Sequence, residues 1–299
     1  MSLENGIKHV SWHKSGNVGV GLRHPHYEEA LKETSLIDFV EIHAENFFAK
    51  GGLSQSLLDE VTARYPVSLH STSMGLGSAV GIDDQYLEKL KRLVDRIDPI
   101  LVSDHACYTW SQFNNGLIHS GDLLPLEFSE RSLAILVQNV DQVQQRLGRP
   151  ILVENLSAYV DLGVHGMSET EFLTELVERS QCHLLIDLNN ILVNANNFGK
   201  TEPLVMSKAW LDEIPISSVA EIHLAGYTPA APNELIIDDH SQPVSNDCWE
   251  LYQYAIHRFG AITTLVEWDN QLPDWETLLA EAHKAKDIMN NLSDSIEGK

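Results

Sequence analysis

The stretch SERSLAILVQNVDQVQQRLGRPILVEN, residues 129–155, contains the pattern that decides the fold. Residues 129–147 carry apolar side chains at helical spacing, with Ser129 in an N-cap position, and Gly-Arg-Pro at 148–150 ends the helix. A short apolar run, Pro150–Asn155, follows directly and ends in polar residues. A helix that leads through a tight turn into a short, almost continuously apolar strand is typical of α/β proteins with a parallel sheet.

The same alternation extends in both directions from this stretch. We expect eight strands, at Asn17–Leu22, Asp38–His43, Pro66–His70, Pro99–Asp104, Pro150–Asn155, His183–Leu188, Val219–Leu224 and Ile262–Trp268. We expect helices at Tyr27–Thr34, Ser54–Arg64, Asp83–Ile97, Ser129–Leu147, Ser168–Arg179, Met206–Glu213, Asp247–Phe259 and about Asp274–Asn290. This alternation predicts a closed (β/α)8 TIM barrel, and an open doubly wound sheet is the alternative. One domain is expected over residues 1–299, with the barrel at about 17–290.

The composition excludes several classes of protein. Hydrophobic residues make up 43% and charged residues 21% of 299 residues, as in an ordinary soluble globular protein. The net charge of −23 makes nucleic acid and anionic membranes poor partners. No apolar run is long enough to span a bilayer, and the N-terminus lacks the apolar core of a secretory signal. Three widely spaced cysteines, Cys107, Cys182 and Cys248, are expected to be buried, reduced side chains of a cytoplasmic protein.

Polar residues gather where the predicted strands end, and in a TIM barrel those ends form the active site. The residues there are Arg23, His24, His26, His43, Glu45, His70, Asp104, His105, Glu154, Asn155, Asp187, Asn189, Asn190, His223, Glu267 and Asp269. Asp238, Asp239 and His240 lie in the loop between the last two strands. Helix capping explains a single Asp or Asn in such a place, but it does not explain the set.

This set of side chains predicts a metal centre. Imidazoles and carboxylates gathered without counter-charges would be costly, and a bound cation reverses that cost. Imidazole and carboxylate without thiolate suit Fe, Mn, Co or Zn. The candidates exceed what one catalytic ion takes from protein, so two or three ions bridged by carboxylates are expected.

Other motifs are weak. The sequence has no HExxH and no GxSxG, and His43-Ala-Glu45 lacks the PCxxC that a zinc deaminase requires. The glycine-rich stretch Gly75–Gly81 lacks the spacing of a dinucleotide-binding loop and is expected to be a turn.

Read in order, the strand ends resemble a known family. The motifs are GVGLRHPHY from Gly19, VEIHAENFF from Val40, YPVSLH from Tyr65, LVSDHACYTW from Leu101, DLLPLEFSE from Asp122, ILVENLSAYV from Ile151, LLIDLNNILVNANN from Leu184, EIHLAGY from Glu221, IIDDHSQPV from Ile236 and LVEWD from Leu265. They resemble the multinuclear non-haem iron-dependent oxidases, a bacterial family of xylose-isomerase-like barrels that includes the methanobactin-maturation oxidase. The resemblance covers residues from about 17 to 290.

The resemblance implies a dioxygen-dependent enzyme with two or three irons, as mixed Fe(II) and Fe(III). It implies a cysteine-containing, ribosomally made peptide as substrate, presented by a small partner protein. The implied iron ligands are His70, Asp104, Glu154, Asp187, Asn190, His223, Asp238, His240 and Glu267. Asp104, His105 and Asn155 are expected to act in catalysis, and His43, Glu45 and Asn155 to support the ligands.

This chain departs from the family at Asp104, where Glu is usual, and at LHSTSMGLG, residues 69–77, where LHGVGLSLG is usual. Two alternatives stay open from the residue types alone. One is a redox-neutral, metal-dependent barrel enzyme of the sugar isomerase or phosphoesterase type, using Mn or Zn. The other is a non-catalytic protein that binds metal or peptide.

Overall fold

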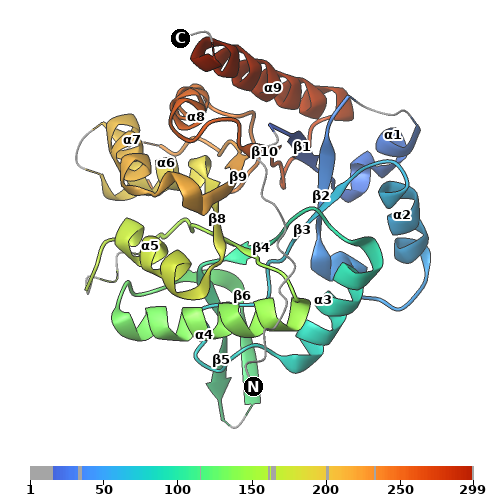
Figure 1. Ribbon diagram of the computed structural model, residues 1–299, viewed down its shortest axis with the longest axis vertical. Helices are drawn as coiled ribbons and strands as arrows, with labels where there is room; N and C mark the ends of the chain where they lie inside the picture. The colour runs from blue at the N-terminus through green and yellow to red at the C-terminus, as the bar shows by residue number, and fades with distance from the viewer. Residues whose placement is uncertain are drawn as a thin grey trace.

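The computed structural model describes residues 16–297, except 33–35, 115, 161, 163–165, 200–201 and 232–233. Eight parallel strands close into a barrel in the order β1-β10-β9-β8-β7-β4-β3-β2 (Figure 1). They are β1 (Val18–Gly21), β2 (Phe39–His43), β3 (Val67–His70), β4 (Val102–His105), β7 (Leu152–Glu154), β8 (His183–Asp187), β9 (Val219–Leu224) and β10 (Thr263–Val266). All the expected barrel strands are therefore present, the TIM barrel is confirmed, and the open sheet is wrong.

Helices cover the outside of the barrel (Figure 1). The α-helices are α1 (Tyr27–Lys32), α2 (Leu53–Thr62), α3 (Asp84–Ile97), α4 (Glu130–Leu147), α5 (Glu169–Ser180), α6 (Leu188–Phe198), α7 (Pro203–Glu213), α8 (Asn246–Phe259) and α9 (Trp275–Glu297). Short 3-10 helices are η1 (His24–His26), η2 (Ala44–Phe47) and η3 (Ile216–Ser218). Within the described part of the chain, no helix combines the length and apolarity that a membrane crossing needs.

Local sequence signals fix the helix starts. The Ser129 side chain accepts a hydrogen bond from the Ser132 amide at the start of α4. Ser168 and Glu171 form a reciprocal capping box at the start of α5. Backbone amides in the first turn of each helix thereby find acceptors. The apolar face of each helix packs on the strands. In α4, for example, Leu136 and Val140 are fully buried in the main core.

Besides the short 3-10 helices, one α-helix and one hairpin lie outside the sequence predictions. Helix α6 follows β8 without a loop, because the Asp187 side chain accepts a hydrogen bond from the Asn190 amide and caps it. Its asparagines are weak helix formers and hid the helical pattern. The second element is an antiparallel hairpin of β5 (Cys107–Phe113) and β6 (Gly116–Pro125) between β4 and α4.

Candidate metal centre

The carboxyl ends of the barrel strands surround a cavity of about 160 Å³. Strand ends and the loops after them supply its walls, as expected for a TIM barrel. Most of the predicted site residues reach it. The lining comprises His43, His70, Thr72, His105, Leu123, Glu154, Leu156, Asn190, Asp238, Asp239, His240, Glu267, Asp269 and Asn270.

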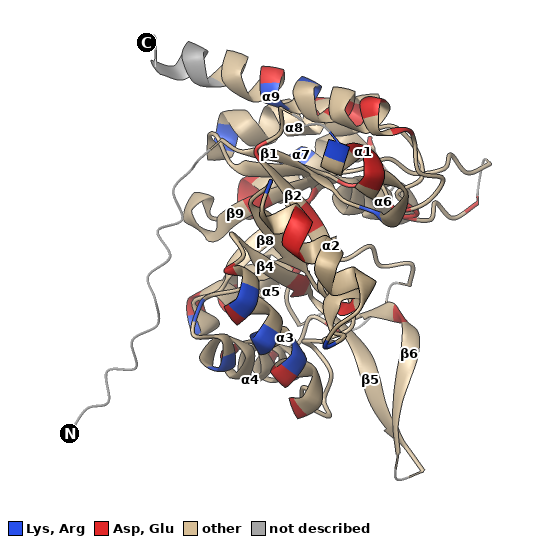
Figure 2. Cartoon of the chain, turned by 90° about the vertical axis from the view of Figure 1, so that its right-hand side faces the viewer, with Lys and Arg blue, Asp and Glu red and all other residues tan. Residues whose placement is uncertain are grey.

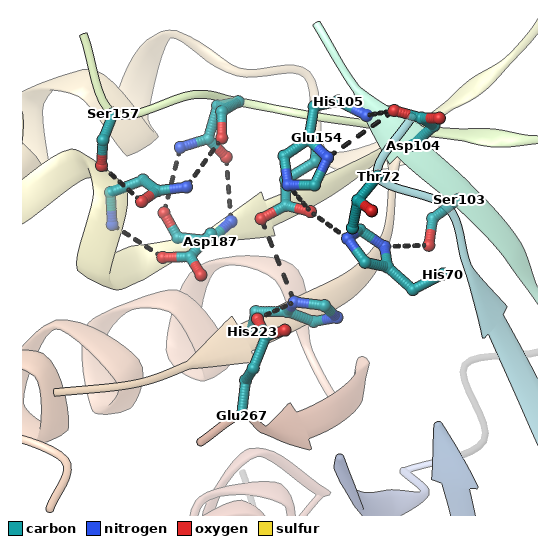
Figure 3. Close-up of polar contacts among 12 residues, drawn as sticks. His70, Thr72, Ser103, Asp104, His105, Glu154, Ser157, Asp187, His223 and Glu267 are labelled. Carbon is teal, nitrogen blue, oxygen red and sulfur yellow. Dashed lines mark hydrogen bonds and ion pairs between the residues drawn. The ribbon is translucent and has the colours of Figure 1, made fainter. Parts of the chain in front are cut away.

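Three buried side chains from β3, β4 and β7 form what we call the strand-end cluster: His70, His105 and Glu154. Glu154 Oε2 lies 3.5 Å from His70 Nε2 and 3.3 Å from His105 Nε2 (Figure 3). The other ring nitrogens face groups on β4. His70 Nδ1 lies 2.8 Å from Ser103 Oγ, and His105 Nδ1 lies 3.6 Å from Asp104 Oδ1. Each imidazole thus has one nitrogen toward the shared carboxylate and one toward a residue that can orient the ring.

A second group, the loop cluster, consists of Asp187, His240 and Glu267. His240 comes from the loop between β9 and α8, where its backbone is left-handed with φ of 44°. Its Nδ1 lies 3.4 Å from Glu267 Oε2, and its Nε2 lies 3.8 Å from Asp187 Oδ2. Asp238 of the same loop adds an oxygen 2.8 Å from His240 Nε2.

The loop is held close to the barrel by its backbone. The Ser241 amide donates to the Gly226 carbonyl, and a Cβ at Gly226 would clash with the Pro243 carbonyl oxygen. Glycine at this position therefore lets the returning chain approach strand β9. That approach brings Asp238 and His240 over the cavity.

His223 connects the two clusters. Its Nδ1 lies 3.1 Å from Glu267 Oε2 and 4.0 Å from Glu154 Oε1. Glu154, Asp187 and His223 also form a group with ligand atoms close enough for one ion. Overlapping groups that share Glu154, Asp187 and Glu267 are what carboxylate-bridged ions require.

The electrostatics also fit a bound cation. Burial raises the pKa of Glu154 to about 8 and the pKa of Asp187 to about 7. Within the described residues, Glu154 Oε2 and Asp187 Oδ2 are buried without a hydrogen-bond partner. Such carboxylates are costly in their charged form unless a cation neutralises them. The donors are imidazole nitrogens and carboxylate oxygens, so the residues present fit iron or a similar divalent ion.

The structure does not bring Asp104 into the cavity. Its Oδ2 accepts a hydrogen bond from the Met74 amide, and its Oδ1 accepts one from the His105 amide. It therefore lies behind His105, and the geometry favours His105 over Asp104 as the ligand. Burial raises the pKa of Asp104 to about 6.

The side chains of Asn155 and Asn190 form hydrogen bonds with nearby backbone groups and with Ser157. Asn155 pairs its carboxamide with the backbone amide and carbonyl of Asp187. Asn190 lines the cavity, but its Nδ2 donates to the Asn155 carbonyl and its Oδ1 accepts from Ser157 Oγ. Both side chains thus hold the ends of β7 and β8 in register at the site.

The remaining predicted residues divide between rim and support. His43 lines the cavity, and one of its ring nitrogens lies within 4.8 Å of carboxylate oxygens of Glu267 and Asp269. Glu45 Oε1 instead accepts hydrogen bonds from the amides of the loop after β3 and from a tyrosine hydroxyl; these donors are Thr72, Ser73 and Tyr86. It thereby holds that loop beside the cavity.

Arg23 is a basic residue that pairs with carboxylates of the cavity wall. Its guanidinium contacts Asp269 and Glu267 at 2.6 and 3.0 Å. Asn189 donates to Asp238, and Asp239 accepts from Thr228. His26 hydrogen-bonds the Pro273 carbonyl, and neither it nor His24 lines the cavity.

Sequence reasoning missed two carboxyl groups inside the barrel. Glu41 and Glu221 are fully buried, and their Oε1 atoms lie 3.8 and 3.9 Å from His223 Nε2. Burial raises the pKa of Glu41 to about 7. The two-residue alternation of a strand carries the signal, because Glu41 stands two before His43 and Glu221 two before His223.

Comparisons with solved structures support the fold. The barrel is similar to a D-psicose 3-epimerase from Clostridium cellulolyticum H10, with a TM-score of 0.55 and 12% identity over 93% of this chain and 99% of the other. It is equally similar to a xylose isomerase domain containing protein from Salmonella typhimurium, with a TM-score of 0.55 and 14% identity over 98% and 99% of the two chains. At such low identity these likenesses show the xylose-isomerase-like TIM barrel and nothing of the activity.

Comparisons of sequence reach further. A UPF0276 protein of Caulobacter vibrioides is 43% identical over 269 residues, 90% of this chain and 92% of its own length. A UPF0276 protein of Vibrio vulnificus is 42% identical over 275 residues, 91% of each chain. The family model described as RiPP precursor modification enzyme MbnB/TglH/ChrH matches residues 17–290, where RiPP denotes a ribosomally made and modified peptide. Together with the strand-end motifs, this places the chain in the MbnB/TglH/ChrH family of RiPP precursor modification enzymes.

Proposed function

We propose that this chain is a dioxygen-dependent, multinuclear non-haem iron oxidase that modifies cysteine in a ribosomally made peptide. The observation that carries the proposal is the overlap of the ligand groups at the barrel mouth, because they share Glu154, Asp187 and Glu267. Separate, unconnected groups would suit independent ions. Shared carboxylates suit a cluster whose ions act together.

The residues take the following roles in this proposal. His70, His105 and Glu154 hold one iron. Glu154, Asp187 and His223 hold a second, and Asp187, His240 and Glu267 hold a third with help from Asp238. Bound iron, as mixed Fe(II) and Fe(III), supplies the redox chemistry with dioxygen. Asp104 orients the His105 ring through the contact with Nδ1, while Asn155 and Asn190 fix the strand ends that carry the ligands.

A thiolate substrate fits the chemistry of the site. The chain's three cysteines are all buried, and none of them lines the cavity. Burial raises the pKa of Cys182 to about 12 and the pKa of Cys107 well above its usual value, so these thiols stay protonated. A cysteine from a bound peptide would therefore meet no internal competitor. Reduced internal thiols also suit the cytoplasm, the proposed location.

The test is co-expression with a candidate cysteine-containing peptide. Its gene is sought beside that of this chain, together with a gene for a small partner protein that presents the peptide. We expect a mass change in the peptide that requires iron and dioxygen and is absent when the peptide cysteine is replaced by serine. An unchanged mass under air with the iron-loaded chain contradicts the proposal. A redox-neutral enzyme would in addition show no dioxygen uptake.

A further inference from the structure

The hairpin of β5 and β6 is the part of the molecule that the site description does not use. Figure 2 shows it extending away from the barrel. Its two strands form a sheet of their own, and within the described residues neither pairs with a barrel strand. An isolated two-stranded hairpin is at best marginally stable in water. A hairpin that projects from the barrel therefore needs an explanation, such as a binding partner.

The surface of the hairpin is almost uncharged and carries exposed apolar side chains near the turn. Its strands contain no Lys or Arg, and Asp122 is their single acidic residue. Phe113, Leu117 and Ile118, near the turn, are 62%, 58% and 47% exposed. Proteins usually protect a free strand edge with charges, proline or a bulge. Here the proline, Pro125, lies at the base, and the pairing is interrupted in the middle of β6, between Leu124 and His119. The outer part of β6, Gly116–His119, has none of these protections.

The base of the hairpin is continuous with the metal centre. Strand β5 begins just after His105, and the Ala106 amide between them donates to the Glu154 carbonyl. At the other end, Leu123 of β6 lines the same cavity as His105 and Glu154. A chain that runs along the hairpin toward its base therefore arrives at the cavity.

The two edges of the hairpin differ. On β5, the amides of Thr109 and Trp110 donate to Ser78 Oγ, and Trp110 Nε1 donates to the Ser73 carbonyl. The loop after β3 thus covers the β5 edge near the base. In the described part of the chain, no strand or loop covers β6 in the same way along its outer half, where Leu117 and Ile118 are exposed.

We propose that the edge of β6 pairs with the precursor peptide as an added antiparallel or parallel strand and leads its cysteine to the cavity. This inference rests on the proposed function. Main-chain hydrogen bonds supply the affinity in strand addition, and the exposed apolar side chains supply contacts. The net charge of −23 and the absence of basic residues on the hairpin favour a neutral or basic, partly apolar peptide.

The test uses the full, iron-loaded chain under argon, so that binding is measured without oxidation. The probe is a displayed library of random peptides of about 20 residues, each with one fixed cysteine, selected on the wild-type chain. Strand addition tolerates many sequences because it uses the peptide backbone, so binders are expected in such a library. A library that yields no binder overturns the inference.

The selected pool is then measured on two triple variants. Phe113→Ser/Leu117→Ser/Ile118→Ser alters the outer hairpin, and Leu53→Ser/Val205→Ser/Ile216→Ser alters three apolar residues on other elements that are at least about as exposed. We expect the hairpin variant to bind the pool at least about tenfold more weakly and the matched variant to bind it as wild type does. Equal binding by both variants overturns the inference. Circular dichroism confirms that each variant is folded.

A second measurement separates strand pairing from side-chain docking. The best selected peptide is synthesised with N-methyl groups on alternate residues, in both phases. Amides of a paired strand point alternately toward and away from their neighbour. One phase should therefore weaken binding about tenfold more than the other, and equal effects overturn strand pairing.

The two proposals fail in different ways. Where the hairpin variant still binds and still modifies the co-expressed peptide, strand addition is wrong and the oxidase stands. Where hairpin-dependent binding is found but no peptide changes mass under air, the oxidase is wrong and the docking surface stands.

Discussion

The strand-end cluster and the loop cluster present similar ligands on different supports. His70, His105 and Glu154 all sit on barrel strands, and both imidazoles face an orienting residue on β4. His240, by contrast, comes from a loop, on a left-handed backbone. Within the described residues its imidazole faces carboxylates on both nitrogens: Asp238 and Asp187 at Nε2, Glu267 and Asp269 at Nδ1.

The two supports differ in how firmly they hold a ligand. A strand holds a ligand within the network of barrel hydrogen bonds, so the strand-end cluster is preorganised. A loop ligand moves with its loop. The Asp238 amide donates a hydrogen bond to the Tyr159 hydroxyl, which belongs to another loop. We therefore expect the strand-end iron to be held more tightly than the loop iron, and the predictions below test that order.

Replacing Glu154 should have the largest effect, because this carboxylate faces His70, His105 and His223 together. Glu154→Ala is expected to remove the iron of the strand-end cluster and the iron that Glu154 shares with Asp187 and His223. Activity should fall roughly 10³-fold, which corresponds to about 4 kcal/mol of activation free energy. Elemental analysis and the peptide mass assay measure the two effects. A variant that keeps its full iron content shows that Glu154 is not a bridge.

Replacing one imidazole in each cluster compares the two directly. His70→Ala should remove the strand-end iron, and His240→Ala should remove the loop iron while the strand-end iron stays. Stepwise chelation of the wild type should then release the loop iron in a fast phase and the other irons in slower phases, and His240→Ala should lose the fast phase. Loss of the slow phase in His240→Ala contradicts the proposed order.

These two clusters were not equally predictable from the sequence. Strand ends can be found because short apolar runs stop at His70, Glu154 and Asp187, and the barrel topology then brings them together. The approach of His240 depends on the close passage at Gly226, which no periodicity reports. Which of Asp104 and His105 faces the cavity depends on the side-chain directions at the end of β4, and two adjacent polar residues leave that open in the sequence.

The hairpin and α6 were not predicted from the sequence, for other reasons. The outer half of the hairpin lacks a buried face, so it shows no apolar alternation, although Asn-Gly at 115–116 is a turn signal. Helix α6 is rich in asparagine, and it begins at Leu188, the last residue of the strand predicted at His183–Leu188. In α6 the Asp187 cap offsets the weak helix propensity of the asparagines.

The residues that orient the strand-end imidazoles should have an intermediate effect. Ser103→Ala removes the partner of His70 Nδ1, and Asp104→Asn weakens the partner of His105. Each is expected to lower iron affinity about 10–100-fold while the fold stays intact. Competition with a chelator measures the affinity. Ser157→Ala is the control, because its hydroxyl bonds Asn190 and not a ligand imidazole. Equal loss in the control shows that the effect is general to the cavity.

The smallest effect on the metal centre is expected from the cysteines, and Cys107 gives the sharpest case. It lies two residues after His105 and is fully buried, so sequence proximity alone would suggest a ligand. Burial, with Asp104 and Glu154 nearby, raises the pKa of its thiol well above the usual value, which opposes the thiolate that a metal needs. Cys107→Ser should keep its iron and lose about 1–3 kcal/mol of stability, because a hydroxyl replaces a buried thiol. Thermal unfolding and elemental analysis measure both quantities, with Cys182→Ser and Cys248→Ser as matched buried controls. Iron loss in Cys107→Ser alone identifies its sulfur as a ligand and adds a soft donor to the strand-end cluster.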